Sequence, residues 1–486
     1  MSNPVFSDTH FTTQVKLLLD KLYGRSILKD SLLERAIHFY ENQPFNQNKL
    51  DKFSQRIAEL SAHSDDEKVQ RQISKIEREF RDFKQELKYE SNERHKFLYV
   101  LCNEIIELTE GANFEESNRK SAQLLGTIQL LSPSEGKKVA EANERSKPLY
   151  KAVLCIRLLD KLCVDGTLNI SEPHIKAILE GVEGDHYKQL KAIDKESYQE
   201  LVEKVKIPIL MAALIQDIGN FHPEAQKILT GEDGTLDPHR TLVVDDRKNL
   251  LQINYRETVK FLVDGIGAPS YVGNSKTDRD KFNLDEHKKL VFIKHLLKSA
   301  IAPKLGVGNL LKVPQIYASI ILSTKSSYNY KLLPKVYQAL DQNAERGTCS
   351  QAIVDALRTI TGDFPQGFGI TYIPKDSDGK DGDHYEYAIV NQLYPNDPTV
   401  PKCRTATRGL TFIGHGQDIE IPLTSNLYHT DTAKEFSMVS KDRLNEILEL
   451  LSSNYHERKN LDLLPRCWQT EEFFSMKNNQ KLWNKS

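Results

Sequence analysis

The stretch Met211–Asn220, MAALIQDIGN, decides the fold, because an apolar run ends there in a polar pair followed by Ile-Gly. The run itself, Ile207–Ile215 (IPILMAALI), contains no polar side chain, which predicts a helix that is buried on all sides. It is shorter than the roughly 20 consecutive apolar residues that a membrane span needs. We therefore expect a buried helix that presents Gln216 and Asp217 at its C-terminal end, where Gly219 lets the chain turn away.

The sequence around this stretch has the periodicity of helices. Residues 146–345 repeat apolar side chains at helical spacing, as in LYKAVLCIRLLDKL from Leu149 and EHKKLVFIKHLLKSAI from Glu286. Such dense periodicity over two hundred residues is typical of a helical bundle. The sequence therefore predicts a mainly α protein with a helical domain at 146–345.

The pattern changes in the C-terminal part of the chain. Residues 346–430 contain short β-branched and aromatic runs after Thr361, separated by clusters of Gly, Pro, Asp and Asn. These runs predict a small β module of about five strands. Residues 431–486 are expected to form a helix at Lys441–Leu451 and a polar tail.

The N-terminal residues 1–110 are helical in pattern and contain a short coiled-coil-like seam. Three interpretations stay open: a single helix packs on its own domain, the seam closes a helical hairpin, or it joins two copies in a homodimer. Its length of about three heptads is short for an independent coiled coil, which favours packing within the chain. Residues 111–145 are polar and predict a linker with one short helix around Leu124–Leu131. The seam consists of Val69, Ile73, Ile76, Phe80, Phe83 and Leu87.

Charge and cysteine usage exclude several classes of protein. The 66 basic and 68 acidic side chains give a net charge of -2, so the chain has no global attraction to a nucleic acid polymer or an anionic membrane. The N-terminus lacks the charged start and apolar run of a secretory signal, and no segment is long enough to span a membrane. The six cysteines form no CxxC pair, which favours reduced, mostly buried thiols and a cytoplasmic location.

Several segments together resemble the HD-GYP family of the HD superfamily. Met211–Asn220 is similar to the AALLHDIGK signature of HD domains, and the likeness extends over residues 186–430, roughly half of the chain. The resemblance implies an HD-type helical bundle of bacterial origin, in which metal ions activate water to hydrolyse cyclic di-GMP. The other similar segments are ILTGEDGTLDP from Ile228, VPQIYASIILSTKSSYNYKLLPKVYQAL from Val313, DALRTITGDFPQGFGITYIP from Asp355 and YAIVNQLYPNDPTVPKCR from Tyr387.

The metal ligands implied by the resemblance are largely replaced. Gln216 stands where the family has its signature His, and Asp217 alone is kept. The family's next His falls near Asn254, its later Asp falls on Ser319, and an upstream His corresponds to His186. Neutral amides and a hydroxyl bind dications much more weakly than imidazole and carboxylate do. We therefore expect no metal cofactor and no hydrolysis, and interpret the chain as a catalytically inactive signalling or scaffold protein.

Such a protein would still bind something, either a cyclic dinucleotide or a partner signalling protein. The amide of Asn220 offers hydrogen bonds to bases or sugars. The loop KSSYNYK offers cations for phosphate and rings for stacking, through Lys325, Tyr328, Tyr330 and Lys331.

The alternative is an active metal-dependent phosphodiesterase with an altered site. A single divalent ion, iron or manganese, would then be held by His186, Asp217 and His222. His222 follows the signature directly and would replace a lost ligand from a new direction. Metal content of the purified protein separates the two hypotheses.

Overall fold

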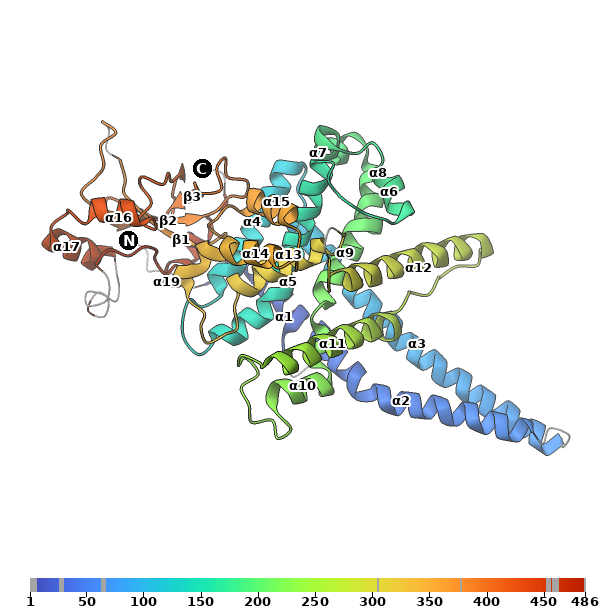
Figure 1. The fold of residues 1–486 in the computed structure, drawn as a ribbon. Coiled ribbons are helices and arrows are strands. Elements are labelled where there is room, and N and C mark those ends of the chain that lie inside the picture. The colour runs from blue at the N-terminus through green and yellow to red at the C-terminus, as the bar shows by residue number, and fades with distance from the viewer. Residues whose placement is uncertain are drawn as a thin grey trace. The chain divides into compact units, whose positions relative to one another are not determined.

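The computed structural model describes residues 7–25, 30–62, 67–303, 306–375, 378–451, 456 and 463–484. The protein is mainly helical, with a small antiparallel sheet in its C-terminal part (Figure 1), which confirms the predicted mainly α class. The chain divides into two compact units. Unit 1 comprises Met1–Leu19, Glu104–Lys206 and Ser299–Ser486, and unit 2 comprises Asp20–Asn103 and Ile207–Lys298. The residues predicted as one helical domain at 146–345 therefore contribute to both units.

A long helical hairpin dominates the first half of unit 2. Helices α2 (Leu32–Ser61) and α3 (Glu67–Thr109) lie side by side (Figure 1), and α2 begins with a capping box formed by Ser31 and Glu34. The predicted seam of α3 faces α2, because the ring of Phe53 lies 5.4 Å from that of Phe80 and 6.2 Å from that of Phe83. This contact confirms that the seam packs within the chain.

The second half of unit 2 contains the segment that decides the fold. Helix α9 (Ile207–Ile215) is buried at every residue, as predicted. It leads through the 3₁₀ turn η2 (Ile218–Phe221) into α10 (Pro223–Thr230). The unit continues with α11 (Val244–Lys260), the π-helical turn η3 (Phe261–Ile266) and α12 (Lys276–Ser299).

Unit 1 is built around the buried helix α5 (Val139–Val164), which packs against α4, α7, α13 and α15. Its other helical elements in chain order are α1 (His10–Tyr23, up to Leu19), α4 (Phe114–Leu131), α6 (Pro173–Leu179), α7 (Gly184–Ile193), α8 (Lys195–Leu201), η1 (Val202–Lys206), α13 (Asn309–Ile321), η4 (Tyr330–Lys335), α14 (Val336–Glu345) and α15 (Gln351–Thr361).

The segment 111–145 differs from the predicted linker with one short helix. Helix α4 fills most of it, and most residues from Ser121 to Leu130 are buried. Gly126 explains part of this packing, since a Cβ atom there would overlap the ring of Trp483. The small side chains that made the segment look like a loop instead allow close contact between helix and neighbour.

The sheet of unit 1 has the strand order β1-β2-β3-β6, with all neighbours antiparallel. Its strands are β1 (Gly369–Tyr372), β2 (Glu386–Val390), β3 (Lys402–Thr405) and β6 (Asp418–Glu420). A separate pair is formed by β4 (Thr407–Arg408) and β5 (Thr411–Phe412). This arrangement confirms the small β module expected from the sequence.

The C-terminal segment packs on this sheet. Helix α17 (Lys441–Leu451) lies where the sequence predicts it, after α16 (Thr430–Phe436). The prediction of a polar tail is wrong for α19 (Glu471–Phe474), η5 (Lys477–Gln480) and their neighbours, because Trp468, Phe473 and Trp483 are buried. Trp468 stacks on Tyr387 of β2 with ring centroids 4.7 Å apart. The tail therefore completes the core of unit 1.

No helix within the described residues is long and apolar enough to cross a membrane. All six cysteines are buried free thiols, which confirms the expectation from their spacing.

Candidate functional site

Two of the predicted site residues meet at the end of α9. Gln216 is 8% exposed, and its backbone carbonyl accepts a hydrogen bond of 3.1 Å from the side-chain amide of Asn254 on α11. Gly219 allows this approach, because a Cβ atom at this position would overlap the carbonyl of Asn254. The backbone N–H of Gly219 also donates to the hydroxyl of Thr258 at 3.1 Å. At this place, where the resemblance implies metal ligands, amide and hydroxyl groups bind backbone and hold two helical segments together.

The remaining predicted positions are divided between the two units. Asp217 is half-buried at the start of η2, and the carbonyl of Asn220 accepts a hydrogen bond of 2.7 Å from Gln226. His186 and Ser319 belong to unit 1, where both are exposed on their helices and contact nearby carbonyl oxygens. Gln216, Asp217 and Asn254 are thus brought together within unit 2, whereas His186 and Ser319 lie in the other compact unit.

His222 lies in a cluster that has the residue types of a metal site. Ligand atoms of His222, Glu224 and Glu257 lie within 4.8 Å of one another, and His222 Nε2 is 3.8 Å from a Glu257 oxygen. Arg256 already pairs with both carboxylates, at 2.6 Å to Glu257. Nδ1 of His222 accepts the N–H of Glu224, so the neutral ring carries its proton on Nε2, the atom that faces Glu257. The cluster as folded therefore binds a guanidinium, and a metal ion would have to displace Arg256 and change the histidine tautomer.

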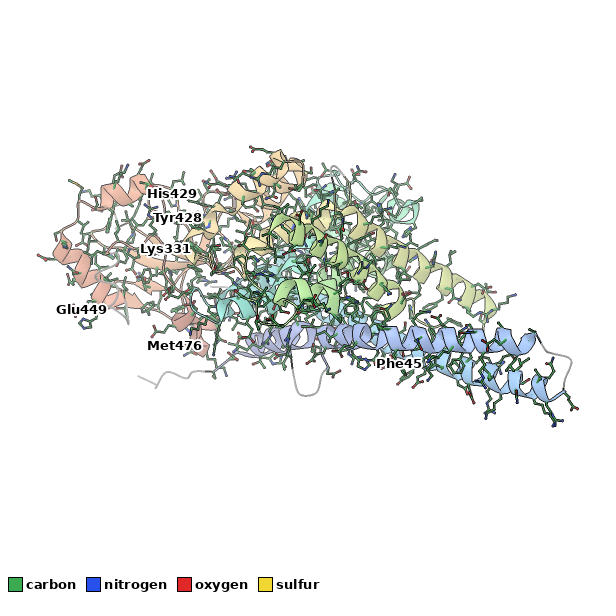
Figure 2. All side chains as sticks on the ribbon, turned by 60° about the horizontal axis from the view of Figure 1, so that its bottom comes forward. Phe45, Lys331, Tyr428, His429, Glu449 and Met476 are labelled. Atoms are coloured by element: carbon green, nitrogen blue, oxygen red, sulfur yellow. The ribbon has the colours of Figure 1, made fainter. Side chains whose placement is uncertain are left out.

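The predicted ligand loop offers less than its sequence suggests. Lys325 and Lys331 are exposed, and the Lys331 carbonyl accepts a hydrogen bond of 3.0 Å from Tyr428 (Figure 2). Tyr330 is only 8% exposed, because its ring stacks on Phe368 at 4.8 Å. The loop therefore presents lysines at the surface, while the ring of Tyr330 belongs to the core.

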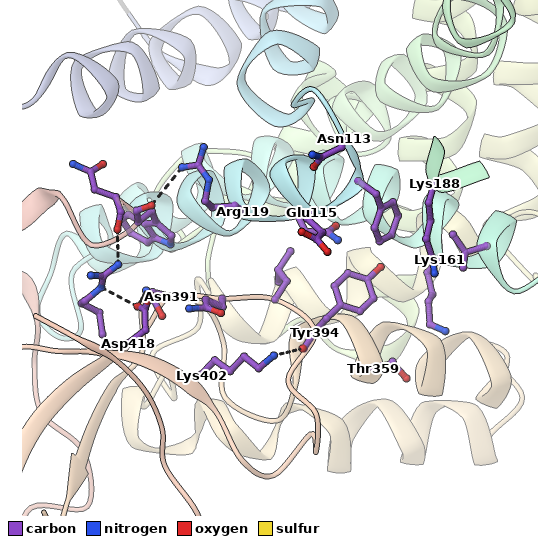
Figure 3. Close-up of a pocket in the computed structure, with 18 residues that line it drawn as sticks. Asn113, Glu115, Arg119, Lys161, Lys188, Thr359, Asn391, Tyr394, Lys402 and Asp418 are labelled. Atoms are coloured by element: carbon purple, nitrogen blue, oxygen red, sulfur yellow. Dashed lines mark hydrogen bonds and ion pairs between the residues drawn. The ribbon is translucent and has the colours of Figure 1, made fainter. Parts of the chain in front are cut away.

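A larger cavity in unit 1 combines the features of a ligand site (Figure 3). Its volume is about 950 Å³, and it lies between α4, α5 and α7 on one side and the segments around β2 and β3 on the other. We call it the basic pocket. Within the described residues it is lined by five cationic side chains, Arg119, Lys161, Lys188, Lys402 and Arg404, by the acidic Glu115 and Asp418, and by Asn113, Phe114, Asn118, Val164, Thr359, Asn391, Gln392, Leu393, Tyr394, Trp483 and Asn484.

Hydrogen bonds to backbone carbonyls hold the cations of the basic pocket in place (Figure 3). Arg404 donates to the carbonyl of Asn484 at 2.6 Å and pairs with Asp418 at 2.9 Å. Lys402 donates to the carbonyl of Tyr394 at 3.2 Å. The other three cations are paired with carboxylates: Arg119 with Glu116 at 3.5 Å, Lys161 with Asp165 at 2.6 Å and Lys188 with Asp185 at 2.9 Å. An anion in the pocket would therefore compete with these ion pairs for the cations.

Several polar atoms of the pocket wall are buried without a hydrogen-bond partner among the residues that the structure describes. They are Oδ1 of Asn118, Oδ1 of Asn391, the hydroxyl of Tyr394 and Nε1 of Trp483. Buried polar groups are nearly always hydrogen-bonded in folded proteins, so each of these atoms needs a partner that the described residues do not supply. A bound ligand or ordered water in the adjacent pocket is the nearest available one.

Tyr394 also has an unusual backbone. Its φ of 55° lies in the left-handed region, which costs a non-glycine residue about 1–2 kcal/mol. Its ring lies 6.0 Å from that of Phe114, and burial raises the pKa of its hydroxyl, which therefore stays protonated as a donor. Backbone strain of this kind is concentrated at ligand-binding sites.

A buried ion cluster lies next to the basic pocket. It consists of Glu110, Arg157, Asp160 and Lys206, with 2.8 Å between Arg157 and Asp160 and 3.0 Å between Lys206 and Asp160. A small cavity lined by Glu110, Asp160 and Lys206 shares Asn113, Phe114 and Lys188 with the basic pocket. The cluster therefore forms part of the support beneath one side of the pocket.

Sequence reasoning missed the basic pocket because its residues come from eight separate stretches and form no motif. The signal that the sequence does contain is the pairing of Lys402 and Arg404 on one short strand beside Asn391 and Tyr394. Comparisons with protein-family models, with curated proteins and with solved structures found no match to this chain.

Proposed function

We propose that the chain is a catalytically inactive signalling protein of the HD-GYP type that binds a cyclic dinucleotide, such as cyclic di-GMP, in the basic pocket. The observation that carries this proposal is the lining of the pocket. Five cationic side chains line it next to aromatic rings and amides, and each has a carboxylate partner within 4.0 Å that a phosphate group would have to displace.

The chemistry of the lining fits each part of such a ligand. Lysine and arginine bind phosphate oxygens, while asparagine and glutamine amides bind base edges. The rings of Phe114 and Tyr394 offer faces for a base, since every base has a π-face that stacks on aromatic side chains. A cavity of about 950 Å³ lies at the upper end of the usual range for small-molecule sites, which favours a ligand of dinucleotide size.

The end of α9 supports the absence of catalysis. A hydrolytic centre with two metal ions needs several charged or imidazole ligands that converge on the ions. Here the amide of Asn254 is used to bind the backbone of Gln216, and the contact between their segments leaves Gly219 no room for a side chain. The amide of Asn254 and the glycine at position 219 therefore each have a structural role that explains their presence without a metal.

Calorimetric titration of the full chain with cyclic di-GMP tests the proposal. We expect saturable binding that weakens as salt is raised, because phosphate contacts are screened. Lys402→Glu should weaken binding by about tenfold or more, the loss of a hydrogen bond to a charged group. Lys325→Glu is the matched control in the loop outside the pocket, and it should bind like wild type. Absence of heat, or equal affinity in both variants, would overturn the proposal.

Active phosphodiesterase chemistry is the second candidate, and the cluster of His222, Glu224 and Glu257 is the observation that favours it. Purified protein would then contain stoichiometric iron or manganese and hydrolyse cyclic di-GMP, and Asp217→Ala would abolish turnover. The signalling proposal predicts no turnover with either ion.

Location and partners extend the same proposal. We place the protein in the bacterial cytoplasm, which suits six buried free thiols. The α2–α3 hairpin is the surface that we propose for a partner protein or a second copy, and it exposes 67% of Phe45 (Figure 2). Light scattering of the full chain distinguishes a dimer from a monomer.

A further inference from the structure

Asn391 and Trp483 belong to the same part of the wall of the basic pocket. The side-chain amide of Asn391 donates a hydrogen bond of 3.0 Å to the carbonyl of Leu482, the residue that precedes Trp483. The carbonyl of Trp483 accepts a further hydrogen bond of 3.4 Å from Arg119 on α4. Asn391, Arg119 and Trp483 all line the basic pocket. These contacts fix the segment around Trp483 against Asn391 in one cavity.

The side-chain amide of Asn391 has a fixed orientation. Asn391 is 2% exposed, and its Nδ2 donates both hydrogens, one to the carbonyl of Leu482 and one to Oδ1 of Asp418 at 3.0 Å (Figure 3). Only the nitrogen can donate to these two acceptors, so the amide cannot be turned over. Its Oδ1 is buried and has no hydrogen-bond partner among the described residues. The wall therefore contains a fixed acceptor that needs a donor.

Trp483 supplies a donor in the same wall. Its indole is 3% exposed and packs against Gly126 of α4, where a Cβ atom would overlap the ring. Nε1 of an indole can only donate, and here it is buried without a partner among the residues described. A buried donor or acceptor that is left unpaired is costly, so each of the two side chains favours a ligand that pairs with it. Trp483 and Asn391 thus offer one donor and one acceptor.

A donor and an acceptor in one wall match the edge of a nucleobase, since bases that are not paired are recognised by hydrogen bonds to the donors and acceptors of their edges. We propose that Asn391 and Trp483 form a base subsite in the basic pocket, which binds the edge of one guanine of the ligand. The guanine N1–H donates to Oδ1 of Asn391, and O6 accepts a hydrogen bond from Nε1 of Trp483. The inference rests on the proposed function, because it assigns one base of that cyclic dinucleotide to a place.

The base subsite leaves the ion pairs of the pocket intact. Its two atoms are neutral and a base edge is neutral as well, so no cation has to leave its carboxylate. A phosphate group would have to displace such partners, for example Asp165 from Lys161 at 2.6 Å. The hydrogen bond from Nδ2 of Asn391 to Asp418 also remains, because the base uses only Oδ1. Binding of the base therefore contributes affinity that does not depend on opening the ion pairs.

Nuclear magnetic resonance of the full chain follows the donor of Trp483 directly. The chain has two tryptophans, so ¹⁵N labelling of tryptophan gives two indole N–H signals, which either Trp483→Phe or Trp468→Phe assigns. The probes are cyclic di-GMP and inosine, which carries the same N1–H and O6 without a phosphate. We expect both probes to shift the Trp483 signal. The Trp468 signal should stay in place, because Nε1 of Trp468 already donates to the carbonyl of Ala388 at 3.0 Å. Inosine methylated at N1 lacks the donor and should shift neither signal.

Calorimetry with cyclic di-GMP measures what the donor contributes to affinity. Trp483→Phe keeps an aromatic ring but removes Nε1, so the dissociation constant should rise about three- to tenfold, which corresponds to one hydrogen bond. Trp468→Phe is the matched control, because Trp468 is likewise 3% exposed but does not line the basic pocket, and its affinity should equal that of wild type. If Trp483→Phe does not fold, the response of the wild-type Trp483 signal to inosine and its methylated form decides alone.

The outcomes separate the base subsite from the proposed function. Heat from cyclic di-GMP with an unmoved Trp483 signal would mean that internal water satisfies the indole, and the subsite would be refuted while dinucleotide binding stands. Equal shifts with inosine and its methylated form would also refute the subsite. A Trp483 signal that moves with inosine alone, with no heat from cyclic di-GMP, would support the subsite and refute the dinucleotide. If neither probe binds to wild type, both proposals are refuted.

Discussion

Replacing Glu110 by Gln tests how far the buried ion cluster stabilises unit 1. Glu110 pairs with Arg157 and, at 2.9 Å, with Lys206, and it accepts a hydrogen bond of 3.0 Å from Tyr198. Glutamine keeps the shape of the side chain but removes its charge, so two buried cations would then face the single carboxylate of Asp160. Removing one partner of a buried ion pair costs about 3–5 kcal/mol. We expect Glu110→Gln to lower the free energy of unfolding of unit 1 by about this amount.

The assay uses the position of the two tryptophans. Trp468 and Trp483 both belong to unit 1, so their fluorescence in a urea titration follows that unit, while circular dichroism follows both. Glu107→Gln is the control, because Glu107 is exposed near the end of α3, just before Glu110, and its change should stay within about 0.5 kcal/mol. A loss below about 1 kcal/mol in Glu110→Gln would refute the reasoning, since the cluster would then be well solvated.

The pH dependence gives a second readout of the same cluster. Burial alone would raise the pKa of Glu110, but Arg157 and Lys206 outweigh it and hold the pKa well below the ordinary 4.5. A carboxyl with a lowered folded pKa contributes stability above its unfolded pKa, and this contribution is lost as the pH falls toward the folded value. Wild type should therefore lose stability below about pH 4.5, and Glu110→Gln should lose less over the same range.

Three further predictions concern packing, a turn and a histidine. Gly219→Ala should destabilise unit 2 by about 1–3 kcal/mol in urea, because the new Cβ atom overlaps the carbonyl of Asn254; an unchanged midpoint would contradict this contact. Leu410→Asn should stabilise unit 1 by about 0.5–1 kcal/mol by tryptophan fluorescence, because Leu410 has a φ of 59° in a two-residue hairpin turn, and a loss of stability would refute the strain. Burial and the nearby Lys289 lower the pKa of His95 from 6.5 to about 4. Unit 2 should therefore lose stability as the pH falls from 6.5 to about 4. In His95→Gln the free energy of unfolding, measured by hydrogen exchange, should depend less on pH over this range.

Local patterns in the sequence predicted the elements whose burial is fixed by their own periodicity. Helix α9 is buried at every residue because it has no polar side chain, and α17 spans the predicted Lys441–Leu451. The α3 seam packs on α2 because rings at spacings of three and four form one stripe. In each case the residue pattern of that one segment was enough to predict which of its side chains are buried.

Other features depend on partners that lie far away in the sequence. Gly126 and the polar residues of α4 look like a loop until Trp483 covers the helix. Tyr330 looks like an exposed ring in KSSYNYK until Phe368 stacks on it. The basic pocket is the extreme case, since Arg119 on α4 and Arg404 on β3 become neighbours only in the folded chain. The periodicity of a single segment does not predict contacts between residues that are far apart in the sequence.

The basic pocket that we propose as the recognition site lies in unit 1. At the end of α9 the side chains of Asn254 and Thr258 bind backbone groups of Gln216 and Gly219 and each other, whereas Oε1 of Gln216 is buried without a partner among the described residues. In unit 1 the basic pocket combines cationic side chains with buried polar atoms that the described residues leave unpaired. Unpaired buried groups lower the stability of the free protein, and a ligand that pairs with them recovers that free energy on binding. A ligand at one hundred times its dissociation constant adds about 2.7 kcal/mol, so unit 1 should gain in melting temperature on binding while unit 2 gains less.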